Sequence, residues 1–465
     1  MKTFFTSILI LGFNLAVISQ SAKPFEVVSI SFKVEPVIEI NDCIKWHVDF
    51  RELKSTVLFR NHIISMGLYG GMVAIDSNLT GVNKQYSNKL NSDLYTNLTV
   101  RHDTLFAEKF NNIYFLSLID TTWKAYSLNE PVALFDILFE DEEFVFYSIS
   151  QGEWGTMLFV YDKSKKLLRA TPYQDDPKCV YFKEGQYYIN AGLRHGSGSS
   201  SFKRISNPKS IAVVSTPQNF RLLITHFNKL PVVDYPPINL ENLEYAKQLE
   251  NVINIEYGIM VNNTTRIMGR EFHFTDYNQW KEQSQSYDKT YITEIVDKKL
   301  NIVDSINAYR VLRTKTYNQF TIIESKFISN GTYLSKGNSI FRIVFKGTPD
   351  HDFWSNRSTT KYVKGVVIPN RIDFFRTVEN NTFNYTISSD TSIIAKGAFD
   401  PIRLYFNING ESRDLKLLSS DNILSKACTF NGNTLLYFDN LGNQDHKYSL
   451  LEIYDMNKFI DEYTK

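Results

Sequence analysis

The sequence predicts a mostly β protein built from β-propeller-like repeats of antiparallel meanders. The chain of 465 residues contains 34 Phe and 27 Tyr, and β-sheets favour such side chains. Short apolar runs alternate with tight turns, as in "EFVFYSIS", "TMLFVYD" and "KKLLRAT", which is the pattern of a meander. Similar units recur irregularly, roughly 30 to 50 residues apart, which indicates radial repetition. The alternative architecture is a pair of β-sandwich or β-barrel domains.

The N-terminus has the three parts of a secretory signal peptide. Lys2 supplies a basic start, residues 4–18 are mainly apolar, and small side chains follow at Ser19, Ser21 and Ala22. The apolar run is too short and too interrupted to span a membrane, and no later stretch is longer. We therefore expect residues 1–22 to be cleaved and the protein to be secreted, with no membrane span in the mature chain.

Four X-Gly turns lie between strand-like runs, in "CVYFKEGQYYINA", "FISNGTYLS", "YFNINGESRDLKLL" and "CTFNGNTLLYFDN". Asn-Gly favours a hairpin because both residues accept positive φ. The first and last units begin with Cys179 and Cys428. With Cys43 the chain has three cysteines, so it can form at most one intramolecular disulfide. Spacing does not assign the pair, and the shared context makes Cys179 and Cys428 the candidates.

One segment departs from the β pattern and marks a boundary. Apolar residues recur there at helical steps, with Asn239 as a candidate cap: Leu240, Leu243, Ala246, Leu249, Val252 and Ile253. A helical linker or insertion is predicted near 238–256. The chain then divides into a β-rich N-terminal half (23–233), a linker (234–258) and a β-rich C-terminal half (259–465).

Arg194-His195-Gly196 follows a strand-like run, and His351-Asp352 lies farther along. This pair of motifs is similar to the histidine acid phosphatases, whose Arg binds phosphate and whose His is the nucleophile. The resemblance implies Arg194, His195 and His351 as catalytic candidates. Ser197-Gly198-Ser199 stands where that family has another Arg and a Pro, and the motif lies far from the start of the mature chain. We therefore interpret it as a Gly/Ser loop between strands.

No other catalytic signature is complete. The sequence lacks a G-x-S-x-G elbow, a P-loop, a dinucleotide fingerprint and an H-E-x-x-H motif, so no cofactor or metal is predicted. The acidic run from Glu140 to Glu143 has the residue type for calcium or glycoside chemistry, but such runs are usually solvated turns. The net charge of +1, without a basic block, excludes a typical nucleic-acid surface.

The remaining signals concern surface recognition. Trp154 sits in the turn "QGEWGT", where an indole could contact a ligand. Asn-X-Ser/Thr acceptors predict glycosylation at Asn78, Asn97, Asn262, Asn330, Asn356, Asn380 and Asn384. The leading hypothesis is a secreted, N-glycosylated protein that binds an extracellular protein or glycan through surface loops. The alternative is a secreted hydrolase of phosphate esters or glycosides with a dispersed site. The oligomeric state stays open.

Overall fold

The structure is a computed structural model of the 465-residue chain. It describes residues 26–35, 37–48, 50, 53–67, 70–109, 112–150, 156–173, 176–183, 185–193, 199–205, 207–214, 241–242, 253–261, 264–271, 290–296, 299–306, 311–317, 320–325, 332–336, 339–346, 362–363, 366–367, 382–386, 391–396, 403–414, 422–430, 433–440 and 448–463.

The described residues form small antiparallel sheets, most of them meanders, so the predicted β-propeller-like fold is confirmed. We name the first three sheets blades 1 to 3. Blade 1 contains β4 (Leu53–Phe59), β5 (His62–Gly67) and β6 (Met72–Asp76). Blade 2 contains β7 (Asn97–Arg101), β8 (Thr104–Lys109), β9 (Asn112–Leu116) and β10 (Trp123–Tyr126). Blade 3 contains β11 (Ile137–Glu140), β12 (Phe144–Ser150), β13 (Thr156–Asp162) and β14 (Leu167–Tyr173).

Three further sheets continue the series as blades 4 to 6. Blade 4 contains β15 (Pro177–Lys183), β16 (Gln186–Leu193), β17 (Ser199–Ile205) and β18 (Glu241–Asn242). Blade 5 contains β19 (Ile253–Val261), β20 (Thr264–Glu271), β21 (Thr290–Val296) and β22 (Lys299–Ile306). Blade 6 contains β23 (Val311–Tyr317), β24 (Phe320–Ser325), β25 (Thr332–Lys336) and β26 (Ser339–Lys346), with β1 (Glu26–Lys33) parallel to β26 at its edge.

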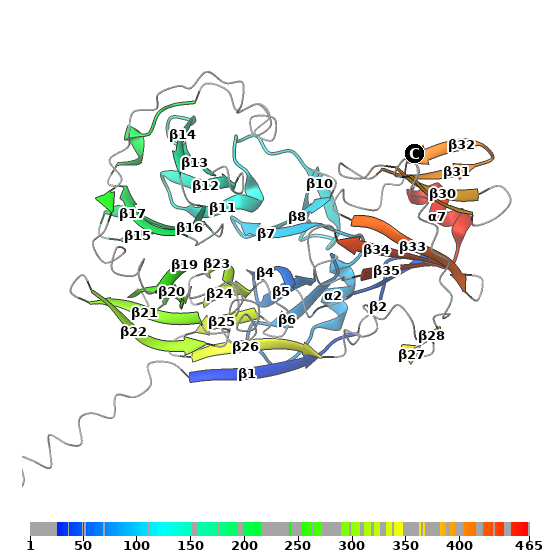
Figure 1. Ribbon diagram of the computed structural model, residues 1–465, viewed down its shortest axis with the longest axis horizontal. Helices are drawn as coiled ribbons and strands as arrows, with labels where there is room; N and C mark the ends of the chain where they lie inside the picture. The colour runs from blue at the N-terminus through cyan, green and yellow to red at the C-terminus, as the bar shows by residue number, and fades with distance from the viewer. Residues whose placement is uncertain are drawn as a thin grey trace, which may run out of the picture.

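The six blades contact one another in sequence and close into a ring. Strand β4 contacts β7, β11 contacts β15, β16 contacts β19, and β19 contacts β23. The turn η1 (Leu134–Asp136) joins blade 2 to blade 3. The ring closes where β24 contacts β4, and there the buried hydroxyls of Thr56 and Thr332 lie 3.2 Å apart. Figure 1 shows these blades on the left of the molecule.

A seventh sheet, which we call the closing sheet, joins the two ends of the described chain. Its order is β2 (Val37–Glu39), β3 (Ile44–His47), β35 (Tyr448–Ile453), β34 (Asn433–Asn440) and β33 (Asn422–Phe430). Helix α7 (Met456–Tyr463) follows β35 and packs Phe459 and Ile460 into the same core. The closing sheet lies at the right in Figure 1, beside β29 (Thr382–Thr386), β30 (Thr391–Lys396), β31 (Arg403–Ile408) and β32 (Glu411–Asp414). The hairpin β27 (Tyr362–Val363) and β28 (Val366–Val367) completes the strands described.

One hydrophobic core fixes the closing sheet to the ring. Trp46 and Ile44 on β3 belong to a buried cluster with Ile63 of blade 1 and with Leu334 and Ile343 of blade 6. Each of these side chains is almost wholly removed from water. Burial of such side chains stabilises by about 1.5–3 kcal/mol each, so the two ends of the chain are held mainly by this shared core.

The predicted X-Gly hairpins agree with the structure, whereas the helix predicted near 238–256 does not. The hairpins β15–β16, β31–β32 and β33–β34 form where the X-Gly turns predict them. The turn Asn409-Gly410 has φ of 51° and 85°, which are the values that this pair of residues accepts. The helical prediction for 238–256 fails at both described ends, because 241–242 and 253–256 are strand. Ile253 and Ile255 also alternate along a strand, and pairing with β20 decides their conformation.

The predicted division at 234–258 separates strands that share sheets. Strand β1 pairs with β26, and β3 pairs with β35, so blade 6 and the closing sheet each draw strands from both predicted halves. The described helices are short: α2 (Lys84–Leu90) is capped by Asn83, whose Oδ1 accepts from Tyr86 N at 3.0 Å. No helix in the described ranges is long and apolar enough to cross a membrane.

Candidate functional site: a face formed by turns

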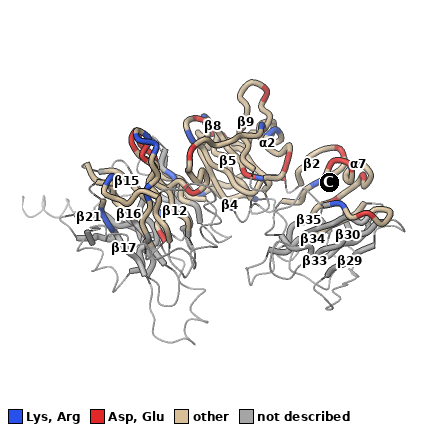
Figure 2. The backbone as a smooth tube through the Cα atoms, turned by 90° about the horizontal axis from the view of Figure 1, so that it is seen from above, with Lys and Arg blue, Asp and Glu red and all other residues tan. Residues whose placement is uncertain are grey.

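The turns at one end of blades 1, 2 and 3 lie side by side, and we call this surface the turn face. It consists of the turns at 60–61, 77–81, 102–103, 117–122, 141–143 and 163–166. Ser77 N donates to Asn61 O at 2.8 Å, and Arg60 Nη2 lies 3.8 Å from Asp103 Oδ2. Antiparallel pairing within blade 2 puts the turns 102–103 and 117–122 at the same end of their sheet. Figure 2 shows charged residues gathered in turns between the strands.

The turns on this face are tight and hold non-glycine residues at positive φ. Arg60, His102, Asp103, Thr121 and Lys166 all have φ between 49° and 54°. Such values are uncommon outside glycine and are concentrated in hairpin turns, where they match the twist of the strands. The hairpins therefore end in defined conformations that present their side chains outward.

Arg101, at the end of β7, is the centre of the contacts that join blade 2 to blade 3. Its Nε donates to Glu140 Oε2 at 2.7 Å and its Nη2 donates to Glu130 Oε2 at 2.7 Å. The side chain of Arg101 is only 8% exposed and that of Glu140 is 15% exposed. A planar guanidinium that meets a carboxylate through two nitrogens is among the strongest ionic contacts in proteins. The cluster therefore fixes the spacing of the two blades under the turn face.

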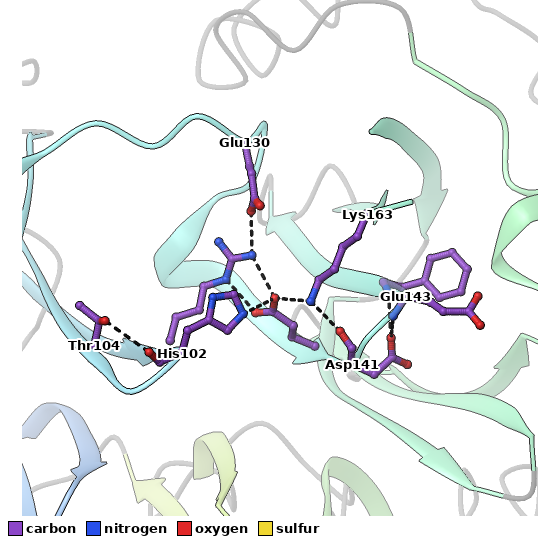
Figure 3. Close-up of polar contacts among 9 residues, drawn as sticks. His102, Thr104, Glu130, Asp141, Glu143 and Lys163 are labelled. Atoms are coloured by element: carbon purple, nitrogen blue, oxygen red, sulfur yellow. Dashed lines mark hydrogen bonds and ion pairs between the residues drawn. The ribbon is translucent and has the colours of Figure 1, made fainter. Parts of the chain in front are cut away.

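Two more side chains, His102 and Lys163, converge on Glu140. His102 Nε2 lies 3.0 Å from Glu140 Oε1, and Lys163 Nζ lies 2.7 Å from the same atom. Figure 3 shows His102, Glu130 and Lys163 arranged around this carboxylate. Although burial alone would raise it, the pKa of Glu140 falls to about 2 because Arg101 and Lys163 stabilise the anion. Glu140 is consequently a poor proton donor near neutral pH.

The acidic run at 140–143 has structural roles in this arrangement. Asp141 Oδ1 accepts from Glu143 N at 2.8 Å and from Phe144 N at 2.7 Å, which closes the turn between β11 and β12. Asp141 Oδ2 accepts from Tyr187 OH at 2.6 Å and ties this turn to blade 4. In the described part of the chain, no group of three or more His, Cys, Asp or Glu side chains is placed to hold a metal.

A hollow of about 530 Å³ opens between the first strands of blades 2, 3, 4 and 6. Val100, Phe139, Val180 and Phe182 contribute apolar surface to its wall, and Lys315 of β23 adds a cation. In a propeller the first strand of each blade is the innermost, so the hollow lies where the blades meet. Its size falls in the range typical of small-molecule sites.

Three large apolar side chains are exposed near the ends of strands in blades 2 and 4. Ile119 is 96% exposed and Leu118 is 47% exposed at the tip of the β9–β10 turn. Phe182, at the end of β15, is 45% exposed and also lines the hollow. Water penalises such side chains unless a partner covers them, and exposed aromatic and aliphatic groups on rigid turns mark binding surfaces.

Several residues predicted from the sequence lie outside the described ranges: Trp154, Arg194, His195, His351, Asn262, Asn330, Asn356 and Asn380. Cys179 is buried on β15, and Cys428 belongs to β33, but the side chain of Cys428 is not described. The proposed disulfide therefore stays a prediction. Of the glycosylation acceptors, Asn78 is exposed in a turn, Asn97 is half-buried at the start of β7, and Asn384 lies on β29.

Arg101, Ile119 and Phe182 are not predicted as functional residues from the sequence. A polar residue at the end of a strand is common, so nothing near Arg101 signals an ion cluster whose partners are 29 and 39 residues away. "SLIDTT" does carry a local signal, since two large aliphatic residues stand directly before the turn residues Asp120 and Thr121.

Comparisons with known proteins add no closer assignment. No family model and no curated protein matches the chain. Solved structures with a weak overall likeness include the N-terminal domain of Nup159 (10% identity, 93% of this chain and 100% of that chain, TM-score 0.30). BamB from Moraxella catarrhalis has 9% identity over 86% of this chain and 94% of that chain, with a TM-score of 0.24. The β-propeller domain of the trilobed protease from Pyrococcus furiosus has 8% identity over 90% of this chain and 95% of that chain, with a TM-score of 0.24. The fold follows from the sheet topology itself.

Proposed function

We propose that this chain is a secreted, N-glycosylated protein that binds an extracellular protein or glycan through the turn face. The observation that carries the proposal is the exposure of Ile119 and Leu118 in the β9–β10 turn and of Phe182 at the wall of the hollow. Large apolar side chains surrounded by charged residues are the arrangement found at the centres of interaction surfaces.

The charges on the turn face support recognition rather than catalysis. Arg60 and Asp103 face one another across two blades, and both remain about half exposed or more. The carboxylate best placed for acid chemistry, Glu140, is ionised and ion-paired, so it cannot serve as the raised-pKa acid that glycoside cleavage requires. A polar rim around exposed apolar anchors fits a binding surface better.

Secretion is tested by expressing the full chain in eukaryotic cells. We expect the protein in the medium, with a mature N-terminus near Lys23 and a mobility that increases after enzymatic removal of N-glycans. Retention of the full-length, unmodified chain inside the cell would contradict the proposal.

Binding is tested with the secreted protein on a glycan array and on a panel of extracellular receptor domains. We expect Ile119→Asp to weaken any specific interaction at least tenfold, because a charge replaces an apolar anchor. Val213→Asp is the matched control, since Val213 is 50% exposed beside β14, away from the hollow. Equal loss in both variants, or turnover of phosphate-ester or glycoside substrates by the wild type, would contradict the binding proposal.

A further inference from the structure

We propose that Asn78 carries an N-linked glycan that covers the blade 1 part of the turn face and leaves its blade 2 and blade 3 parts, with Phe182 of blade 4 beside the hollow, open for the partner. The inference rests on the proposed secretion of the chain. Asn78, Leu79 and Thr80 form the acceptor tripeptide in the turn that follows β6. Both Asn78 and Thr80 are exposed there, so a bulky modification meets no packed neighbour.

The local geometry suits an acceptor. Thr80 Oγ1 donates to Asn78 Oδ1 at 2.8 Å, and Thr80 N donates to the same oxygen at 3.3 Å. This turn uses the oxygen of the Asn78 amide, whereas a glycan is joined to its nitrogen, Nδ2. The modification and the folded turn therefore use different atoms and are compatible.

The step requires a lipid pyrophosphate oligosaccharide, the donor class of the secretory lumen. Nδ2 of Asn78 forms a bond to the anomeric carbon of the donor sugar. The bond between that carbon and the pyrophosphate oxygen breaks, the lipid pyrophosphate leaves, and the amide nitrogen loses one proton to a base. No oxidant or reductant takes part.

Asn97, the other N-glycosylation acceptor whose side chain the structure describes, differs from Asn78 in its exposure and in its secondary structure. Asn97 is half-buried, begins β7 and pairs with Glu108 on β8. Its Oδ1 accepts from Leu98 N at 3.1 Å, and β7 packs against β4 of blade 1. Because Asn97 is half-buried on a strand whereas Asn78 is exposed in a turn, we expect lower occupancy at Asn97 than at Asn78.

The position of Asn78 determines what its glycan covers. Ser77 N donates to Asn61 O at 2.8 Å, so the acceptor turn lies directly beside the Arg60-Asn61 turn of blade 1. Ile119 and Phe182 lie on blades 2 and 4 instead. A flexible, hydrated glycan at Asn78 would exclude partners from blade 1. It would favour contact with Ile119 in the β9–β10 turn and with Phe182 beside the hollow.

Occupancy is tested by mass spectrometry of the secreted wild-type protein, with enzymatic deglycosylation that converts a glycosylated Asn to Asp. We expect conversion at Asn78 in most molecules and at Asn97 in far fewer. Thr80→Val should remove one glycan, while Thr80→Ser, which keeps the hydroxyl, should retain it. A bare Asn78 beside occupied acceptors elsewhere would overturn this inference alone. The absence of glycans at every acceptor would overturn the proposed glycosylation and this inference with it.

The shielding is tested by limited trypsin digestion of the glycosylated and the deglycosylated protein. Arg60 has a side chain 49% exposed beside the acceptor turn, and Lys166 is exposed in the β13–β14 turn of blade 3. We expect deglycosylation to raise cleavage after Arg60 several-fold and to leave cleavage after Lys166 unchanged. Equal cleavage after Arg60 in both forms would overturn the shielding, and a parallel rise at both sites would show general loosening rather than local cover.

Discussion

At the scale of single residues, the balance between desolvation and pairing decides which ion pairs stabilise the folded protein. Arg101 is nearly buried, and burial alone would disfavour its charge, yet its contacts with Glu130 and Glu140 more than offset this and raise its pKa. Lys84 and Glu35 are 3.1 Å apart, but both are exposed by two thirds or more. Water and salt weaken such a surface pair almost completely.

This contrast predicts that Arg101→Met destabilises the protein by about 3–5 kcal/mol, because Glu140 would remain buried without its main partner. Lys84→Met should cost less than about 1 kcal/mol. Equilibrium unfolding in urea measures both free energies. Similar small losses in the two variants would show that the Arg101 cluster does not hold blades 2 and 3 together.

The ionisation of Glu140 predicts a pH dependence of stability. Its pKa is about 2 in the folded chain against an ordinary value of 4.5, so the folded state binds this proton more weakly than the unfolded state. The contribution is therefore complete above about pH 5 and is lost as the pH falls towards about 2. In Glu140→Gln the acid-induced loss of unfolding free energy should be smaller by about 3 kcal/mol. Glu35→Gln, at an exposed pair, should leave the pH profile unchanged.

At the scale of elements, the turns rather than the strands restrict the sequence. The strands accept many apolar and aromatic residues, whereas some turns require a backbone conformation or a space that side chains do not fit. Gly70, between β5 and β6, has φ of 94°, and a Cβ there would lie 2.4 Å from Tyr95 O. Gly185, between β15 and β16, has φ of 75° but open space around it.

Comparing substitutions at Gly70 and Gly185 distinguishes the cost of backbone strain from the cost of steric crowding. Gly185→Ala should cost about 1–2 kcal/mol, because only the left-handed conformation is penalised. Gly70→Ala should cost a further 1–3 kcal/mol or so, since the backbone of residue 95 must also move. Thermal or urea unfolding of both variants measures the difference, and equal losses would contradict the close approach at Gly70.

At the scale of the whole molecule, the two ends of the described chain are held in one structure by strand pairing and a shared core. Asn41 Nδ2 donates to Glu462 Oε2 at 2.8 Å and to Tyr463 OH at 2.7 Å, which fixes α7 against the turn before β3. Cys43 lies beneath these contacts and is fully buried. Burial raises the pKa of its thiol to about 11. A reagent that needs the thiolate therefore reacts slowly, because the sulfur is inaccessible and is protonated near neutral pH.

Labelling of Cys43 therefore reports on the opening of this closure. We expect Phe459→Ala to destabilise the protein by about 3–5 kcal/mol and to speed the modification of Cys43 strongly, because Phe459 is fully buried in the core beneath α7. Mass spectrometry of the Cys43 peptide after timed thiol labelling gives the rate. Exposed Tyr126→Ala on blade 2 serves as the control, and an equal rate in both variants would contradict the role of α7.

Local chemistry in the sequence determined the class of fold and several of its turns. Aromatic residues, alternation and turn pairs such as Asn409-Gly410 predict antiparallel hairpins, because strand pairing within a hairpin depends on neighbouring residues. The same local patterns misassign the ends of the 238–256 segment. Ile253 fits both the predicted helix face and a strand face that it shares with Ile255, and only the partner strand β20 decides between them.

The tertiary structure alone decided how the blades close and where the turn face lies. Strand β3 meets β35 across some 400 residues, and Arg101 meets Glu140 across 39, so neither contact leaves a periodic signal in the chain. Such contacts form because nonlocal burial and ion pairing outweigh the cost of bringing distant segments together. The sequence thus specifies the strands through short-range preferences, and the assembled ring places their turns on one surface.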